Sequence, residues 1–200
     1  MSEDSPYVVA VYGSPRRQGN TARLLDECLR GVATWTSRVD KLVLRDLDIS
    51  PCLEIYGCKR DGRCVIKDDF VWVADKLAAA DVILLATPVM FYNVSAQAKL
   101  LIDRCQAFWV KKHLLCQPIN ADKPHRKGVV IATAASHGQR LFEGTMMTAR
   151  YWFEALDVEM AAALCFRGLD GKDDVLAHPD FLQQAHELGR DLPNLPRAAI

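Results

Sequence analysis

The feature that most constrains this chain is an apolar segment that runs into a polar, glycine-bearing loop near the N-terminus. Val8–Tyr12 is apolar throughout, and residues 13–21 read Gly-Ser-Pro-Arg-Arg-Gln-Gly-Asn-Thr. The short apolar run predicts a buried strand, and the amphipathic segment after the loop predicts a helix. Because a helix N-terminus presents unpaired N–H groups and a partial positive charge, this turn predicts an anion site.

The loop carries side chains that suit a small phosphate. Ser14, Arg16, Asn20 and Thr21 provide hydroxyl, guanidinium and amide groups. Five residues separate its two glycines, instead of four, and no Lys follows the second, so it is not a nucleoside-triphosphate loop, and it lacks the G-x-G-x-x-G of a dinucleotide fold. The sequence therefore favours a monophosphate ester held by hydrogen bonds. The alternative is an ordinary strand-to-helix turn with a capped helix.

Strand-like and helix-like segments alternate along the chain. The strand-like runs cover residues 8–12, 39–44, 82–86, 129–133 and 158–165, and the helix-like segments lie near residues 21–36, 69–80, 95–109, 139–156 and 180–192. This alternation predicts parallel strands with helices on both faces of the sheet, in three layers. Because residues 8–12 and 82–86 are apolar throughout, we expect them at the centre of the sheet. The length predicts one domain over residues 1–200.

The composition is that of a globular protein with reduced cysteines. Its 25 Lys and Arg balance 25 Asp and Glu, so nothing indicates nucleic acid as a partner. Residues 1–6 are acidic and polar, and charges interrupt every apolar run, so we expect no signal peptide, no membrane partner and a cytoplasmic location. Seven cysteines, an odd number, favour free thiols or a metal or redox role over a disulfide framework.

A second loop, after the third predicted strand, is rich in apolar side chains. Its candidate ligand-contacting residues are Pro88, Val89, Met90, Phe91 and Asn93. Such a loop can lie along a flat aromatic ring while its backbone groups bind the polar edge of the ring. The same aromatic side chains would also suit the core or an oligomer contact.

The two loops together resemble those of the NADPH-dependent FMN reductases, a family of flavodoxin-like flavoproteins. Members carry G-S-x-R-x-x-G-N-T after the first strand, as residues 13–21 do, and hold the FMN phosphate with it. After the third strand they carry P-x-Y/F-x4-S/T-x3-K-x3-D-R, and the matching positions here are Pro88, Ser95, Lys99, Asp103 and Arg104. We expect structural roles for Ser95, as a helix N-cap, and for Lys99 with Asp103, as a surface pair.

The resemblance implies an α/β flavodoxin-like three-layer sandwich with a five-stranded parallel sheet in the order 2-1-3-4-5. This order brings the loops after strands one, three and four together at the carboxyl edge. By resemblance, the third loop contacts the isoalloxazine edge through Ala134, Ser136, His137 and Gly138. The alternative for His137 is a solvated loop histidine.

The resemblance also implies an FMN-dependent NAD(P)H oxidoreductase, which passes hydride from NADPH or NADH through FMN to a flavin, a quinone or another small acceptor. Because the cofactor carries the chemistry, no side chain is assigned a catalytic role. A homodimer or homotetramer is implied, with Phe91 and Trp109 as candidate interface residues. The alternative is a non-enzymatic FMN electron carrier, which the neutral charge disfavours because such carriers usually dock through an acidic surface.

Residues 51–70, here called the cysteine loop, carry three of the seven cysteines. The iron–sulfur branch of the family has P-C-x2-C-x2-C-x5-C here and binds a [4Fe–4S] cluster with the four thiolates. Cys52, Cys58 and Cys64 match this pattern, but Ile55 stands at the second position. Since such a cluster needs four thiolates, and since the spacing lacks the paired cysteines of zinc sites, we expect free thiols and no metal. An iron–sulfur flavoprotein with an atypical cluster site is the alternative.

Overall fold

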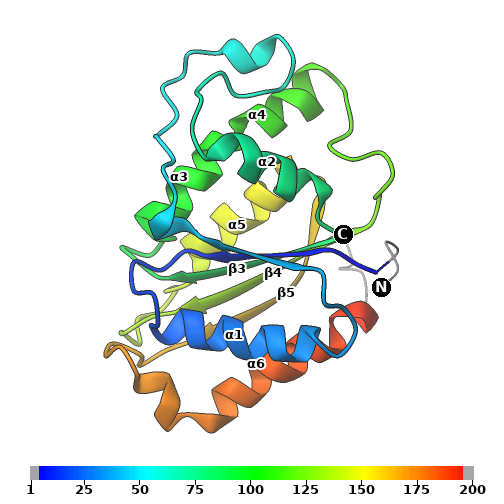
Figure 1. The fold of residues 1–200 in the computed structure, drawn as a ribbon. Coiled ribbons are helices and arrows are strands. Elements are labelled where there is room, and N and C mark those ends of the chain that lie inside the picture. Colours follow the sequence, from blue (N-terminus) through cyan, green and yellow to red (C-terminus); the bar gives the residue numbers. More distant parts are fainter. Residues whose placement is uncertain (1–4, 196–200) are drawn as a thin grey trace.

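The computed structural model describes residues 5–195 and shows one five-stranded parallel sheet (Figure 1). The strands are β1 (Val8–Tyr12), β2 (Val39–Val43), β3 (Val82–Pro88), β4 (Arg126–Thr133) and β5 (Val158–Phe166). Their order is β2-β1-β3-β4-β5, and each neighbouring pair is parallel. The predicted flavodoxin-like order is therefore confirmed.

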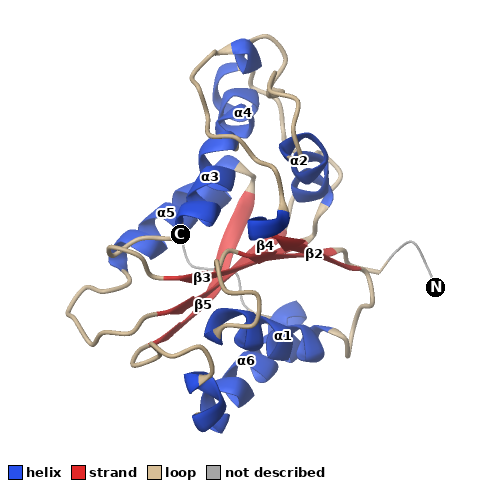
Figure 2. Ribbon diagram, turned by 60° about the vertical axis from the view of Figure 1, so that its left-hand side comes forward, coloured by secondary structure: helices blue, strands red, loops and turns tan. Residues whose placement is uncertain are grey.

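Helices cover both faces of the sheet, which makes three layers (Figure 2). On one face lie α1 (Asn20–Val32) and α6 (Pro179–Asp191). On the other face lie α2 (Phe70–Ala79), α3 (Ala96–Arg104), α4 (Gln106–Trp109) and α5 (Glu143–Ala155). The three-layer sandwich that the alternation of segments predicts is thus confirmed.

The side chains of the central strands fill two hydrophobic cores. Val9 and Val11 of β1 belong to the core under α2, α3 and α5, whereas Val8 and Ala10 belong to the core under α1 and α6. All four residues are 0% exposed. Because successive side chains of a strand point to opposite faces, an apolar run throughout is what a strand covered on both faces requires.

Glycines let α1 and α6 pack closely against each other. A Cβ on Gly31 would lie 2.1 Å from the carbonyl oxygen of His186, and a Cβ on Gly189 would lie 1.9 Å from that of Cys28. The absence of a side chain at both positions permits this approach of the two backbones. Since α6 lies beside α1, the segment that leads from β5 into α6 passes the N-terminus of α1.

Some predicted boundaries differ from the observed ones. The helix predicted over residues 95–109 is divided into α3 and α4 at Cys105, where ψ is 0°, and a π-helical segment, Val110–Leu114, follows. The helix predicted over residues 139–156 begins only at Glu143, because a turn with Arg140 at a φ of 58° precedes it. The prediction that residues 1–6 are not part of a signal peptide falls largely on residues 1–4, which lie outside the described residues. Within residues 5–195, no helix is both long and apolar enough to cross a membrane.

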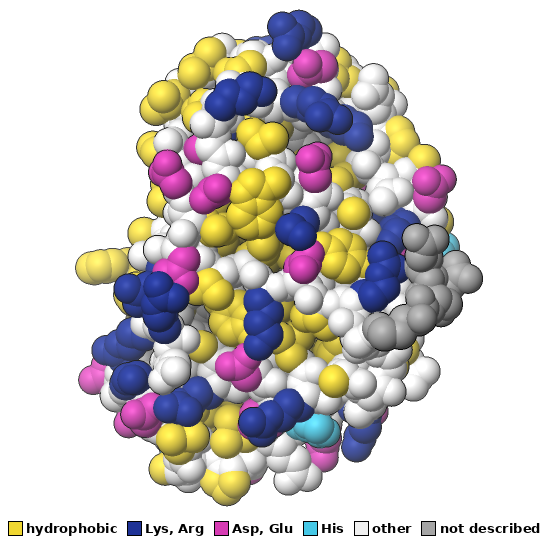
Figure 3. Space-filling model, viewed as in Figure 1, with side chains coloured by type: hydrophobic (Ala, Val, Ile, Leu, Met, Phe, Trp, Pro, Cys, Tyr) yellow, Lys and Arg dark blue, Asp and Glu magenta, His cyan; other side chains and the backbone are white. Residues whose placement is uncertain are grey.

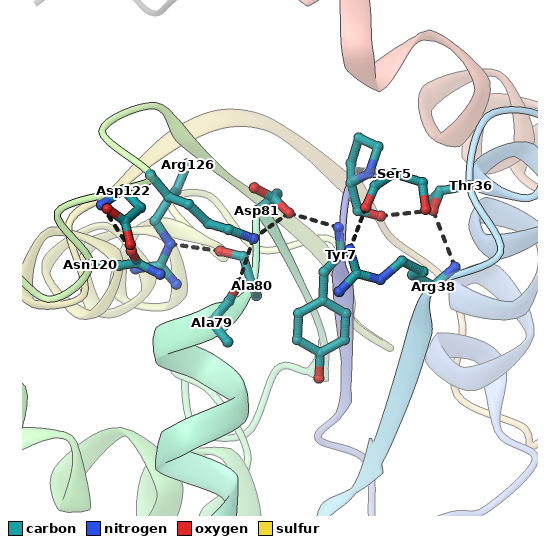
Figure 4. Close-up of polar contacts among 12 residues, drawn as sticks. Ser5, Tyr7, Thr36, Arg38, Ala79, Ala80, Asp81, Asn120, Asp122 and Arg126 are labelled. Carbon is teal, nitrogen blue, oxygen red and sulfur yellow. Dashed lines mark hydrogen bonds and ion pairs between the residues drawn. The ribbon is translucent and has the colours of Figure 1, made fainter. Parts of the chain in front are cut away.

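At the amino edge of the sheet, polar side chains form hydrogen bonds and ion pairs with other residues of the chain (Figure 4). The guanidinium group of Arg126, a residue that is 1% exposed, donates to the carbonyl oxygens of Ala80 at 2.7 Å, Leu156 at 2.5 Å and Leu77. These carbonyls lie at the C-terminal ends of α2 and α5, so one cation caps two helices. Burial lowers the pKa of Arg126 to about 10, although neighbouring carboxylates favour its charged form.

Candidate functional site

The loops that follow β1, β3 and β4 meet at the carboxyl edge of the sheet, on the left of Figure 1. Between them lies a cavity of about 220 Å³. Its walls come from these three loops and from the segment after β5: Ser14, Pro15, Arg16, Gly19, Asn20, Thr21, Pro88, Val89, Met90, Thr133, Ala134, Ala135, Leu169 and Asp170. The carboxyl edge is where ligands bind in open α/β sheets.

The N-terminus of α1 opens into this cavity. Its N-cap residue is Gly19, which has no side chain that could cap the helix, and the first turn of the helix contains no acidic residue. The unpaired N–H groups and the positive end of the helix dipole therefore suit an anionic ligand. Ser14 and Thr21, which are 7% and 2% exposed, bring two hydroxyl groups to the same wall.

The segment after β5 holds two of the predicted phosphate-binding side chains. Nη1 of Arg16 donates to the carbonyl oxygen of Asp170 at 2.8 Å. Nδ2 of Asn20 donates to the carbonyl oxygen of Gly171 at 2.7 Å, and its Oδ1 accepts from the N–H of Val175 at 3.1 Å. Asn20, which is 6% exposed, thus uses both polar atoms of its amide to shape the cavity wall.

Sequence reasoning missed Leu169 and Asp170, which belong to this segment and line the cavity. No motif marks the last third of the chain, but topology offers a signal. Because α1 and α6 pack on one face, the chain that enters α6 must pass the N-terminus of α1. Three further lining residues belong to loops that sequence reasoning singled out but were not themselves predicted: Pro15, Gly19 and Thr133. Ala135, within the range 134–138 that the resemblance implies, also lines the cavity.

Behind the cavity, Ser95 joins the first two loops. Its hydroxyl donates to the carbonyl oxygen of Gly13 and accepts from the N–H of Ala98 at 3.2 Å. The second contact confirms the prediction that Ser95 caps the N-terminus of α3. The predicted surface pair of Lys99 and Asp103 is also confirmed, with a distance of 2.7 Å between its charged atoms. These matching positions therefore have structural roles.

The second loop contains a tight turn that presents aromatic side chains. Met90 and Asn93 exchange two backbone hydrogen bonds, of 2.8 and 3.0 Å. Between them, Phe91 and Tyr92 have φ values of 50° and 62°, in the left-handed region that bulky residues rarely adopt. Phe91 is fully exposed. Figure 3 shows hydrophobic atoms that protrude on the left, where the carboxyl edge lies in the same view of Figure 1. Backbone strain of this kind is frequent at ligand-binding sites.

Tyr92 connects the second loop to the third loop and to α5. Its hydroxyl oxygen lies 2.7 Å from the place of a Cβ on Gly138, and its carbonyl oxygen lies 2.4 Å from the place of a Cβ on Gly144. In addition, the hydroxyl of Thr148 in α5 donates to Oδ1 of Asn93 at 2.9 Å. Two loops that are distant in the sequence therefore form one packed unit.

The third loop contributes less to the cavity than the resemblance implies. Ser136 and His137 are exposed, and the carbonyl oxygens of His137 and Gly138 accept hydrogen bonds from Arg167 at 3.2 and 2.8 Å. Eight predicted residues line the cavity: Ser14, Arg16, Asn20, Thr21, Pro88, Val89, Met90 and Ala134. Five lie in the same loops outside its walls: Phe91, Asn93, Ser136, His137 and Gly138. Contact of all thirteen with a cofactor stays a prediction.

Residues 6–165 match the family model of the NADPH-dependent FMN reductases. The chain belongs to this family. Membership confirms the predicted family and, as properties of that family, the oxidoreductase class, the FMN cofactor and the nicotinamide electron donor. The match spans all five strands and ends in β5, so the segment that carries Leu169 and Asp170 lies beyond it.

This member of the FMN reductase family is also similar to curated iron–sulfur flavoproteins. One from Methanocaldococcus jannaschii is 40% identical over 97 residues, which are 48% of this chain and 50% of the relative. One from Archaeoglobus fulgidus is 34% identical over 96 residues, which are 48% of this chain and 44% of the relative. The chain spans about half the length of the curated relatives it matches.

Solved structures with the same fold extend over nearly the whole chain. A NAD(P)H:quinone oxidoreductase from Methanothermobacter marburgensis has a TM-score of 0.69 at 17% identity, covering 98% of this chain and 100% of its own. An FMN-dependent NADH-azoreductase from Bacillus anthracis, in complex with FMN, has a TM-score of 0.65 at 11% identity, covering 93% and 99%. At these identities the likeness shows the flavodoxin-like fold.

Proposed function

We propose that this chain binds FMN at the carboxyl edge, with the FMN phosphate at the N-terminus of α1. The observation that carries the proposal is the uncapped N-terminus of α1, which opens into the cavity beside Ser14, Arg16 and Thr21. Hydroxyl groups, a guanidinium group and a helix dipole together suit a monophosphate ester. We assign residues 1–200 to one FMN-binding domain.

The remaining walls of the cavity suit a flat ring. Val89 and Met90 offer apolar contact, and the side chains of Ala134 and Ala135 are small enough for a ring edge to approach the backbone. Around this cavity lie five residues that we assign to the rim of the same site: Phe91, Asn93, Ser136, His137 and Gly138. When bound, FMN supplies the reversible acceptance of hydride, and the chain's own residues bind and orient it.

We assign to this site the NAD(P)H-dependent reduction of a small acceptor, such as a flavin or a quinone. Family membership supports the reductase assignment. Met90 lines the cavity and is 44% exposed, so this wall of the site is open to small molecules in solution. We assign no side chain a nucleophilic or proton-transferring role, because binding and orientation are what the lining residues are equipped to do. A cytoplasmic location and the lack of a nucleic-acid partner stay predictions from the sequence.

A homodimer or homotetramer is part of this proposal. Exposed aromatic and apolar side chains support it: Phe91 is 103% exposed, Trp109 of α4 40%, and Met147 and Tyr151 of α5 63% and 65%. Large apolar side chains that share a surface mark protein interfaces. Size-exclusion chromatography with light scattering tests the assembly, and a monomer that binds FMN and turns over would contradict it.

The decisive experiment is an anaerobic absorbance spectrum of the FMN-reconstituted protein before and after NADPH, followed by NADH in a parallel sample. We expect bound-flavin bands that bleach promptly and recover when a quinone is added. Bound flavin that stays oxidised with either nucleotide would favour the electron-carrier alternative. If no flavin bound, the assignment of the carboxyl-edge cavity would be wrong.

A further inference from the structure

The cysteine loop forms the end of the molecule that is drawn in cyan at the top of Figure 1. It packs tightly through two glycines. A Cβ on Gly57 would lie 2.3 Å from the side chain of Val65, and a Cβ on Gly62 would lie 2.8 Å from Cβ of Lys111. The loop is therefore folded on itself and against the π-helical segment after α4, and it lies outside the walls of the cavity at the carboxyl edge.

Three thiols come near one another in this loop. Cys52, Cys58 and Cys64 are each partly buried. Burial raises the pKa of the Cys58 thiol, and the neighbouring Cys64 and Cys52 thiols raise it further. Because Gly57 packs directly against Val65, the loop brings Cys58 and Cys64, two of the three cysteines that match the cluster pattern of the iron–sulfur branch, close together. Even so, residues 5–195 contain no group of three or more Cys, His, Asp or Glu side chains arranged to hold a metal ion.

The fourth thiolate is missing at residue 55. Ile55 is 59% exposed and lies between Glu54 and Tyr56, whose φ values are 50° and 59°. Its alkyl side chain offers no ligand atom to iron, and a [4Fe–4S] cluster is ordinarily held by four thiolates. The residues present therefore do not fit the cluster that the names of the curated relatives imply.

The other cysteines do not replace the missing ligand. Cys28 belongs to the core on the opposite face of the sheet, and Cys105 is buried in the core under α2, α3 and α5. Burial raises the pKa of both thiols to about 12, so thiolate formation is strongly disfavoured at either position. Cys116 and Cys165 are exposed, Cys165 on β5, and within residues 5–195 neither joins a group of three or more Cys, His, Asp or Glu side chains that could hold a metal ion.

A buried ion pair closes the base of the cysteine loop. The side chains of Arg104 and Asp68 are 0% and 5% exposed, and they form two hydrogen bonds, of 2.6 and 3.0 Å. Nη1 of Arg104 also donates to the carbonyl oxygen of Ser50 at 2.8 Å, and the N–H of Ser50 donates to Asp68 at 2.9 Å. Residues on both sides of the three cysteines are therefore tied to one guanidinium group.

Arg104 also reaches the thiol cluster. Burial acts to lower its pKa, but Asp68 and the Cys64 thiol beside it outweigh burial and raise that pKa. A buried, permanently charged group with this many partners can fix the arrangement of a loop. These protein contacts hold both ends of the cysteine loop.

We infer that the cysteine loop is a three-thiol loop held by Arg104 and Asp68 that does not assemble a [4Fe–4S] cluster, and that the residue at position 55 decides this. The inference concerns a site separate from the cavity at the carboxyl edge, and it holds whether or not that cavity binds FMN. It predicts that one added thiol at position 55 converts the loop into a cluster site.

The test is anaerobic reconstitution with ferrous iron and sulfide of the wild type, of Ile55→Cys and of the control Leu53→Cys, with iron and acid-labile sulfide measured per chain. Leu53 is 64% exposed in the same loop, so its variant adds an equally accessible thiol out of register. We expect about four irons and four sulfides in Ile55→Cys and background amounts in the other two. Adding Cys58→Ser to Ile55→Cys should abolish the uptake.

Two results would overturn the inference. One is a wild-type chain that takes up three or four irons with matching sulfide, and that loses them in Cys58→Ser. The other is background iron in Ile55→Cys while its circular dichroism and thermal unfolding match those of the wild type. FMN content, measured on the same samples, reports separately on the proposed flavin site.

Discussion

The amino and carboxyl edges of the sheet differ in whether their polar groups have hydrogen-bond partners within the chain. At the amino edge, Arg126 is 1% exposed and donates to three backbone carbonyl oxygens, and Asp81 accepts from the N–H of Tyr7 at 2.7 Å (Figure 4). At the carboxyl edge, α1 begins without a side-chain cap, and Phe91 has a φ of 50° in a turn. The amino edge satisfies its buried cation internally. The carboxyl edge pairs Arg16 and Asn20 with the segment after β5, but it leaves the N-terminus of α1 open to a ligand and stores backbone strain.

This difference separates stability from binding. Buried polar groups support the fold only when their partners are present, so changes at the amino edge should lower the free energy of unfolding. Open donors and strained turns contribute to ligand binding, so changes at the carboxyl edge should alter FMN affinity more than stability. Measuring both quantities on the same variants tests the separation.

The largest effect on stability is expected for Arg126→Met. The change leaves the carbonyl oxygens of Ala80, Leu156 and Leu77 without their buried donor. We expect the free energy of unfolding to fall by roughly 2–4 kcal/mol in urea denaturation. Arg150→Met, at an exposed position of α5, is the control and should change it by less than about 0.5 kcal/mol. Equal effects of the two variants would contradict the structural role of Arg126.

The largest effect on binding is expected for Arg16→Met. The guanidinium group lines the cavity beside the N-terminus of α1, so its loss should weaken FMN binding by roughly 1.5–3 kcal/mol, measured by fluorescence titration. Arg17→Met is the matched control, because that side chain pairs with Asp46 at 2.5 Å and is 63% exposed. If the two variants weakened FMN binding equally, the loop would act through general charge and not through a specific contact.

A pair of glycines tests whether Tyr92 links the second loop to its support. Gly144→Ala directs a Cβ at the backbone oxygen of Tyr92, 2.4 Å away, so the turn must move. Gly138→Ala meets only the hydroxyl end of the same side chain, at 2.7 Å, which can rotate away. We expect Gly144→Ala to weaken FMN binding by about 1–2 kcal/mol and Gly138→Ala to do so less. The reverse order would exclude displacement of the turn as the cause.

The smallest effect is a pH dependence at the amino edge. Burial raises the pKa of Asp157, but hydrogen bonds from the Ile119 N–H and from Lys112 outweigh it and bring the pKa below its usual value. A lowered pKa in the folded state adds stability above the unfolded pKa of about 3.9, and this stability is lost as the pH falls through the folded value. Asp157→Asn should therefore flatten the decline of stability below about pH 4. Parallel acid-unfolding curves for the two proteins would refute this.

Hydrophobic patterning was sufficient to predict the architecture. Val8–Tyr12 and residues 82–86 read as central strands because both of their faces are apolar, and the structure buries them on both faces. Because the apolar pattern reflects burial directly, it can be interpreted without knowledge of the tertiary contacts. Helix ends were less accurate, since turns such as the one at Arg140 depend on neighbouring loops.

The candidate site was only partly readable from the sequence. Loop residues such as Ser14 and Val89 could be placed because a strand's carboxyl end fixes where its loop begins. The wall formed by Leu169 and Asp170 could not, because no local pattern marks it. Nor could the sequence show that Asn20 uses its amide to hold this wall.

The sequence by itself determined the alternation of strands and helices, the family and the loops at the carboxyl edge, because apolar periodicity and short polar motifs are local properties of the chain. The strand order was predicted from the resemblance to the family. Only the tertiary structure decided which polar side chains are already paired. Arg104 and Arg126 are buried partners of distant backbone groups, and Arg16, which lines the cavity, is paired with the distant carbonyl oxygen of Asp170. The physical reason is that the role of a charge depends on burial and on partners far away in the sequence, which packing alone brings together.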